Sequence, residues 1–141
     1  MKKLVLFLIV VIIILPLSAV YQKIGEYDTA GWVRSVFVSN DIAYVANDGG
    51  GLLIIDVSNP QNPALLGAYD TPYYAYSVFV SNNIAYVADY GSGLQIIDVS
   101  NPQNPSLLGS YDTSGYAYSV FVSNNIAYVA DYGSGLQIID V

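Results

Sequence analysis

The chain has 141 residues, 54% of them hydrophobic and 11% charged, and its net charge at pH 7 is −7. Nucleic acids and anionic lipid surfaces repel an acidic body of this kind, so neither is expected as a partner. The sequence contains no Cys and no His. Disulfide bonds and thiolate chemistry are therefore excluded, and so is the side chain that most often serves as general base or transition-metal ligand.

Residues 1–19 are typical of a secretory signal peptide. Two lysines precede a long apolar run, and the small residues Ser18 and Ala19 follow Pro16 and Leu17. This order predicts export, with cleavage after Ala19. An uncleaved membrane anchor is the alternative, because the uncharged stretch from Leu4 to Gln22 just reaches spanning length. Both interpretations place the rest of the chain outside the membrane, either secreted or in the cell envelope.

A regular repeat follows the signal. Val36, Val78 and Val120 are spaced by 42, and residues 75–99 recur unchanged as residues 117–141. This spacing fits four-stranded propeller blades and some helical arrays. The repeats are rich in Val, Ile, Tyr and Leu and are interrupted by Asn-Pro, Asn-Asn and Gly-rich steps, which indicates strands rather than helices.

Each repeat is predicted to contain four antiparallel strands joined by short links. In the second repeat these strands are Tyr76–Val80, Ile84–Ala88, Leu94–Val99 and Leu107–Tyr111. Consecutive apolar residues such as Ile96 and Ile97 require cover on both faces of the sheet, which stacked blades provide and a two-sheet sandwich does not. The predicted fold is therefore an all-β propeller of four-stranded blades. A β-helix with two rungs per repeat is the alternative.

The repeats divide the chain after the signal into units. Residues 20–29 match the fourth strand of a unit, residues 30–71 and 72–113 form full units, and residues 114–141 form a partial unit of three strands. An N-terminal strand that completes the last blade is expected. Three blades are fewer than the four to eight of closed propellers. Three outcomes remain open: a fragment of a longer protein, an open arc of three blades, and a homodimer that completes a six-blade ring.

Short motifs in these units resemble a known family. Ala-Tyr-Val-Ala at 43–46 precedes Leu-Leu-Ile-Ile-Asp at 52–56, and the pattern recurs as Leu-Gln-Ile-Ile-Asp at 94–98 and 136–140. In this pattern, the sequence resembles the LVIVD repeat proteins of prokaryotic cell surfaces. The resemblance implies a β-propeller and says nothing about an activity.

Two sets of repeated carboxylates are interpreted as structural. One carboxylate closes the third strand of each unit, at Asp56, Asp98 and Asp140, and in the two full units Ser-Asn-Pro follows it. A carboxylate at this position accepts N–H groups of the following turn. A second set, each in Tyr-Asp-Thr, is predicted to cap the turn into the next blade; its members are Asp28, Asp70 and Asp112. One carboxylate per blade does not supply the converging oxygens of a calcium site. No metal, no cofactor and no catalytic residues are assigned.

The least repeated residues lie in two sets of loops that a propeller opens on one face. Freedom to vary in otherwise constant repeats is typical of recognition loops. The predicted ligand-binding residues are Trp32, Tyr74, Tyr116, Tyr90 and Tyr132. Aromatic rings beside carboxylates suit sugars, peptides or cations. The tyrosines inside strands, Tyr44, Tyr86 and Tyr128, are instead predicted to be packing residues.

The sequence therefore predicts an exported or cell-surface scaffold, not an enzyme, that presents an aromatic and acidic rim to extracellular protein or glycan partners. The alternative is a fragment of a secreted propeller hydrolase that acts on glycosides with a pair of carboxylates and whose catalytic residues lie in further blades. The repeated Asp residues are equivalent by position, so no two of them have a reason to differ in pKa as an acid and a base must.

Overall fold

A computed structural model describes residues 21–141, in which the regular structure consists of eleven β-strands in three sheets. The signal or anchor predicted for residues 1–19 lies outside the described residues. Within residues 21–141 there is no helix of the length and hydropathy that crossing a membrane requires.

The first two sheets are four-stranded antiparallel blades with their strands in chain order. The first contains β1 (Ser35–Ser39), β2 (Ile42–Ala46), β3 (Leu52–Asp56) and β4 (Ala64–Tyr69). The second contains β5 (Ser77–Ser81), β6 (Ile84–Ala88), β7 (Leu94–Asp98) and β8 (Ser106–Tyr111). These strands confirm the four predicted for each full unit. The antiparallel order within each unit rules out the β-helix, whose rungs pair in parallel.

The third sheet has three strands, β9 (Tyr116–Ser123), β10 (Ile126–Tyr132) and β11 (Gly135–Asp140). In every blade, the first two strands are joined by a two-residue turn with both residues at positive φ, as in Asn82 (51°) and Asn83 (61°). This type I′ conformation matches the twist of the paired strands and favours Asn. The repeated Asn-Asn and Asn-Asp pairs thus determine these hairpins locally.

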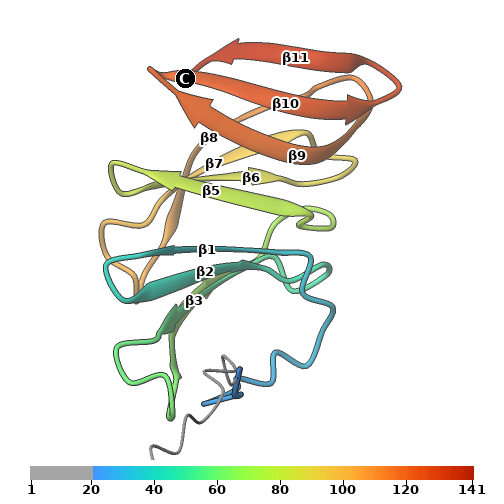
Figure 1. Cartoon of the computed structure of the whole chain (residues 1–141). Coiled ribbons are helices and arrows are strands. Elements are labelled where there is room, and N and C mark those ends of the chain that lie inside the picture. The colour runs from blue at the N-terminus through green and yellow to red at the C-terminus, as the bar shows by residue number, and fades with distance from the viewer. Residues whose placement is uncertain (1–20) are drawn as a thin grey trace, which may run out of the picture.

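The three blades stack face against face along the chain (Figure 1). One apolar core lies between the first and second blades and another between the second and third. Three phenylalanines at equivalent positions of the repeat join the blades along their first strands: the ring of Phe79 lies 5.0 Å from Phe37 and 4.9 Å from Phe121. Each core is formed by residues of two neighbouring blades, so a single blade does not bury its apolar faces by itself.

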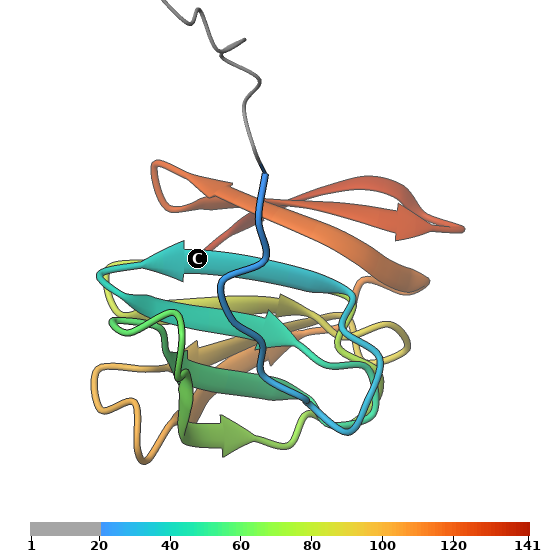
Figure 2. The same ribbon diagram turned by 60° about the horizontal axis from the view of Figure 1, so that its bottom comes forward.

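The N-terminal strand predicted over residues 20–29 does not form. Val20 lies outside the described residues, and residues 21–29 pair with no strand of the three sheets. Residues 24–29 instead lie across the outer face of the first blade, as the blue segment in Figure 2 shows. This position is distant in sequence and in space from β11, which the segment was expected to complete. The arc formed by residues 21–141 is open.

Successive blades are also linked through their loops. Asp48 forms an isolated β-bridge with Ala75 of the second blade, and Tyr90 forms the equivalent bridge with Ala117 of the third. Among the described residues, no further blade follows the third, and its corresponding hairpin extends instead, so that Asp131 pairs with Gly135. The geometry of each loop therefore depends on the blade that follows it.

Candidate functional site: an aromatic rim

Three equivalent positions per blade meet along one edge of the stack and form a continuous band, which we call the rim. Two positions precede or begin the first strand of a blade, and the third lies at the end of its second strand or in the loop that follows. The rim consists of Trp32, Arg34 and Asp48 in the first blade, Tyr74, Tyr76 and Tyr90 in the second, and Tyr116, Tyr118 and Tyr132 in the third.

Tyr90 is the centre of the rim in the second and third blades. Its ring stacks on Tyr116 with centroids 4.4 Å apart and an interplanar angle of 11°. It also packs against Tyr76 at 5.3 Å and Tyr118 at 5.7 Å. Tyr116 continues the stack to Tyr132 at 6.5 Å. Ring contacts in these offset and edge arrangements are favourable beyond the area that they bury.

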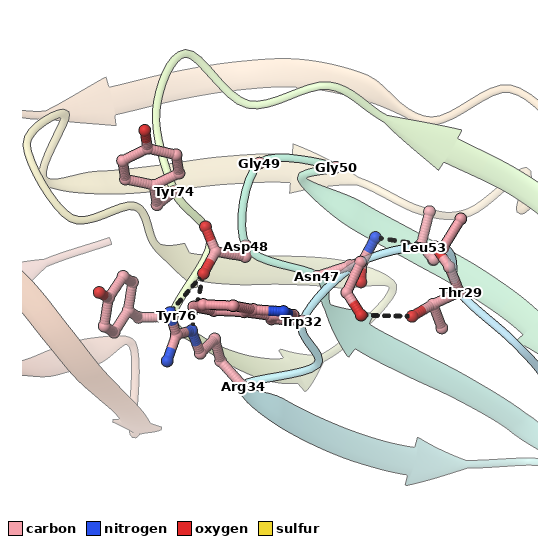
Figure 3. A pocket seen from close by; sticks show the side chains of 12 residues that line it. Thr29, Trp32, Arg34, Asn47, Asp48, Gly49, Gly50, Leu53, Tyr74 and Tyr76 are labelled. Carbon is pink, nitrogen blue, oxygen red and sulfur yellow. Dashed lines mark hydrogen bonds and ion pairs between the residues drawn. The ribbon is translucent and has the colours of Figure 1, made fainter.

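In the first blade the rim carries an ion pair instead of tyrosines. The Arg34 guanidinium donates to one carboxylate oxygen of Asp48 through both Nε, at 2.8 Å, and Nη2. Its Cζ lies 5.3 Å from the ring centroid of Trp32 and 4.8 Å from that of Tyr76 (Figure 3). These cation–π contacts connect the first blade to the tyrosines of the second. The hydrogen bond to Asp48 raises the pKa of Arg34.

An open pocket of about 760 Å³ lies beside this ion pair (Figure 3). Its walls include Trp32, Arg34, Asp48, Tyr74 and Tyr76. The pocket thus offers three aromatic rings, a cation and a carboxylate within one hollow. Small polar ligands with an apolar face are bound by sites of this composition.

All five predicted ligand-binding residues lie in the rim. Tyr74, Tyr90, Tyr116 and Tyr132 form a chain of ring contacts, so the two loop sets do open on one edge. Trp32 reaches that chain through Arg34. Whether these residues bind a ligand remains a prediction.

Sequence reasoning missed four members of the rim: Arg34, Tyr76, Tyr118 and Asp48. The signal was available, because the first three occupy one position of the repeat and Asp48 occupies the position of Tyr90. Position 34 breaks the repeat with a cation where the other blades carry tyrosine. Its partner position 48 changes with it, from tyrosine to the carboxylate that the cation needs.

Two of the three carboxylates at the ends of the third strands accept hydrogen bonds from their turns, as predicted. Asp56 Oδ1 accepts the N–H of Ser58 at 2.8 Å, and Asp98 Oδ1 accepts that of Ser100 at 2.8 Å. Hydrogen bonds from Ser58 lower the pKa of Asp56, and those from Ser100 lower the pKa of Asp98. Charged acceptors of this kind stabilise the turn that leads to the fourth strand.

The second set of carboxylates caps turns in two of the three blades. Asp28 Oδ1 accepts the N–H of Ala30 at 3.1 Å, and Asp112 Oδ1 accepts that of Ser114 at 2.9 Å. At the equivalent place after Asp70 stands Pro72, which has no N–H to donate. Among residues 21–141, no group of three or more acidic side chains is placed to hold a metal ion.

A buried carboxylate lies beneath the rim. Asp89 accepts the Thr71 hydroxyl at 2.7 Å and the N–H of Tyr73 at 3.0 Å. Its side chain is fully buried, and burial raises its pKa. Asp89 therefore fixes the loop that carries Tyr73 and Tyr74 from below. The carboxylates at this position were not singled out from the sequence, where they look like ordinary loop residues.

Stacked four-stranded blades with a variable loop edge define an all-β, propeller-like repeat scaffold. The sequence matches the LVIVD repeat at residues 30–71, 73–113 and 114–141. The chain therefore belongs to the LVIVD repeat family, as its motifs suggested. No curated protein matches it.

A solved structure supports the fold alone. The crystal structure of the computationally designed Ika4 protein superposes with a TM-score of 0.64 at 12% sequence identity. The alignment covers 77% of this chain and 66% of the designed one, so this chain spans slightly less than two thirds of that protein's length.

Proposed function

We propose that this protein is an exported or cell-surface repeat scaffold whose rim binds extracellular glycan or protein partners. The observation that carries the proposal is the unbroken band of aromatic rings and one ion pair from Trp32 to Tyr132. Export is supported by the order of basic, apolar and small residues at the N-terminus.

Within one chain, the most exposed rings of the rim keep most of their surface in solvent despite their contacts with neighbouring rim residues. Trp32 is 73% exposed and Tyr132 is 72% exposed. Large apolar surfaces of this kind mark interaction sites when they are contiguous. Arg34 and Asp48 add a donor and an acceptor beside Trp32, which suits a ligand with hydroxyl groups and a flat apolar face. Asp56 and Asp98 are occupied by backbone N–H groups of their turns, and we assign the protein a binding role and no catalytic one.

Replacing Trp32 by Ala tests this proposal. Binding of the fluorescently labelled protein to a glycan array and to intact prokaryotic cells is measured for both forms. We expect a dissociation constant at least about fivefold higher, because an aromatic anchor contributes more than about 1 kcal/mol. The melting temperature should change little, since the ring lies in solvent.

Tyr21→Ala is the matched control, because Tyr21 is an exposed aromatic residue outside the rim. It should leave binding unchanged. Equal binding by the parent protein, Trp32→Ala and Tyr21→Ala would contradict a binding role for the rim.

A further inference from the structure

The outer face of the third blade and the outer face of the first blade correspond to the two surfaces that pack together wherever one blade follows another. Within the chain, the same contact occurs twice, between the first and second blades and between the second and third. We propose that two copies of this chain join head to tail through this contact, with residues 22–27 of each copy forming the fourth strand of the other copy's third blade. This inference does not depend on the proposed function.

The outer face of the third blade carries side chains whose equivalents are buried in one or both of the other blades. Leu136 is 63% exposed, whereas its equivalents Leu52 and Leu94 are both 0% exposed. Ile138 is 65% exposed, and its equivalent Ile54 is 0% exposed. Tyr128, predicted to be a packing residue, is also exposed here, although Tyr44 and Tyr86 are buried as predicted. The residues that bury themselves against a following blade are thus present and uncovered.

The outer face of the first blade provides the surface that these side chains fit. Inside the chain, Leu52 and Ile54 share a core with Val78, Val87 and Val99 of the second blade. The equivalents of these three valines in the first blade line an open apolar pocket of about 320 Å³. They are Val36, Val45 and Val57. On this outer face, the third blade of a second copy would contact the same residue types that the first blade contacts on the second blade within one chain.

One strand of a blade that would precede the first blade is already present. A Cβ at Gly25 would collide with the Pro60 carbonyl, as one at Gly67 in β4 would collide with the Pro102 carbonyl. Gly25 and Gly67 occupy equivalent positions of successive repeats, as do Pro60 and Pro102. The N-terminal segment therefore lies on the first blade just as β4 lies on the second. It occupies the fourth-strand position of a preceding blade whose other three strands are missing.

The third blade lacks that fourth strand. Within the described residues, β11 pairs only with β10 and leaves its other edge free. An exposed strand edge with apolar side chains invites pairing with another chain. The contact of β3 with β4 aligns Leu53 with Ala68 and Ile54 with Gly67. Transferred by the repeat, this register places Gln137 of one copy opposite Glu26 of the other.

Two copies are the number that closes such a ring. A head-to-tail contact generates a closed ring or an open filament. Two chains of three blades give six, which lies within the four to eight blades of known propellers, whereas three chains give nine. In the ring, the free edge of β11 in each copy pairs with residues 22–27 of the other copy, and both apolar end faces are covered.

A disulfide across the predicted register tests the contact in a chain that has no cysteine of its own. The full chain is produced separately as Glu26→Cys and as Gln137→Cys, and the two proteins are mixed and mildly oxidised. We expect a disulfide-linked pair of one copy of each to be the main cross-linked product. The control replaces Gln137→Cys by Gln103→Cys, an exposed cysteine in the loop between β7 and β8, which should give only a minor product.

Equal yields from the test and control pairs would overturn the proposed register. The unmodified protein should have twice the mass of one chain in light scattering, and a monomer or an open-ended polymer would overturn the ring. Leu136→Lys adds an independent readout, because this side chain is mostly exposed in a single copy. It should leave the fold of the chain intact and weaken association at least tenfold, and unchanged association would overturn the proposal.

Discussion

At the scale of single residues, Asp89 connects the buried core to the rim. It is fully buried, and both of its oxygens accept hydrogen bonds, from Thr71 and from the backbone of Tyr73. The equivalent pair in the third blade, Thr113 and Asp131, does not repeat this bond, and Thr113 Oγ1 is buried without a partner. The same residue types thus form a closed hydrogen-bond arrangement only where a following blade holds the loop.

Asp89→Ala should lower the free energy of unfolding by about 1–3 kcal/mol, because the Thr71 hydroxyl and the Tyr73 N–H lose their acceptors. Asp89→Asn should cost less, since its amide oxygen still accepts from one of them. Urea unfolding of the three proteins at pH 7 measures the difference. Equal stability of Asp89→Ala and the parent would show that water satisfies these groups.

The contribution of Asp89 to the stability of the fold changes with pH in a defined direction. Burial raises its pKa in the folded protein, so its contribution to stability is greatest at low pH and is lost as the pH rises through that raised value. Asp56 and Asp98 act in the opposite direction, because their lowered pKa values make their contribution disappear as the pH falls. The stability difference between the parent and Asp89→Asn should therefore change in favour of the parent from pH 7 towards pH 4.

At the level of elements, the loop between the second and third strands has different roles in different blades. Tyr90 lies in the β6–β7 loop, bridges to Ala117 and stacks on Tyr116. Tyr132 occupies the equivalent position in the third blade, where its ring is mostly in solvent. One position of the repeat thus carries a packing residue in the second blade and an exposed rim residue in the third.

Tyr90→Ala should therefore destabilise the protein, by about 2 kcal/mol, because several aromatic contacts are lost together. Tyr132→Ala should change stability by less than about 0.5 kcal/mol. Thermal unfolding followed by circular dichroism compares the two variants. Similar losses for both would mean that the ring contacts of Tyr90 contribute little.

At the level of the whole molecule, stability lies in the contacts between blades. Tyr44 and Tyr86 are buried in these contacts, one in each core. Burial raises the pKa of both phenols, because the phenolate would lose its water. For a raised pKa, the stability is fully present below the ordinary tyrosine value of about 10 and is lost as the pH rises through the folded value.

We therefore expect cooperative unfolding above about pH 10 as these phenols ionise. Absorbance of tyrosinate at 295 nm and circular dichroism should change together. Tyr44→Phe/Tyr86→Phe keeps the rings and removes the ionisable groups, so it should shift the alkaline transition to higher pH. An unchanged transition would place the sensitive groups elsewhere.

The sequence by itself determined the strands, the turns and the family. Strand propensity and turn chemistry act over a few residues, so the Asn-Asn hairpins and the carboxylates of Asp56 and Asp98 appear where they were predicted. The loop residues Trp32, Tyr74 and Tyr132 were likewise identified as rim residues, because they lie in the loops that vary where the repeat is otherwise constant.

Only the tertiary structure decided which equivalent residues are buried and where the N-terminal segment lies. Leu52 and Leu136 have nearly the same neighbours in sequence, yet one is covered by the next blade and the other is not. The expected closure of the third blade by residues 20–29 fails within one chain, because three stacked blades leave their two ends apart. Burial, the Tyr90 ring contacts and the contact of Arg34 with Tyr76 depend on neighbouring blades, which local sequence patterns do not encode.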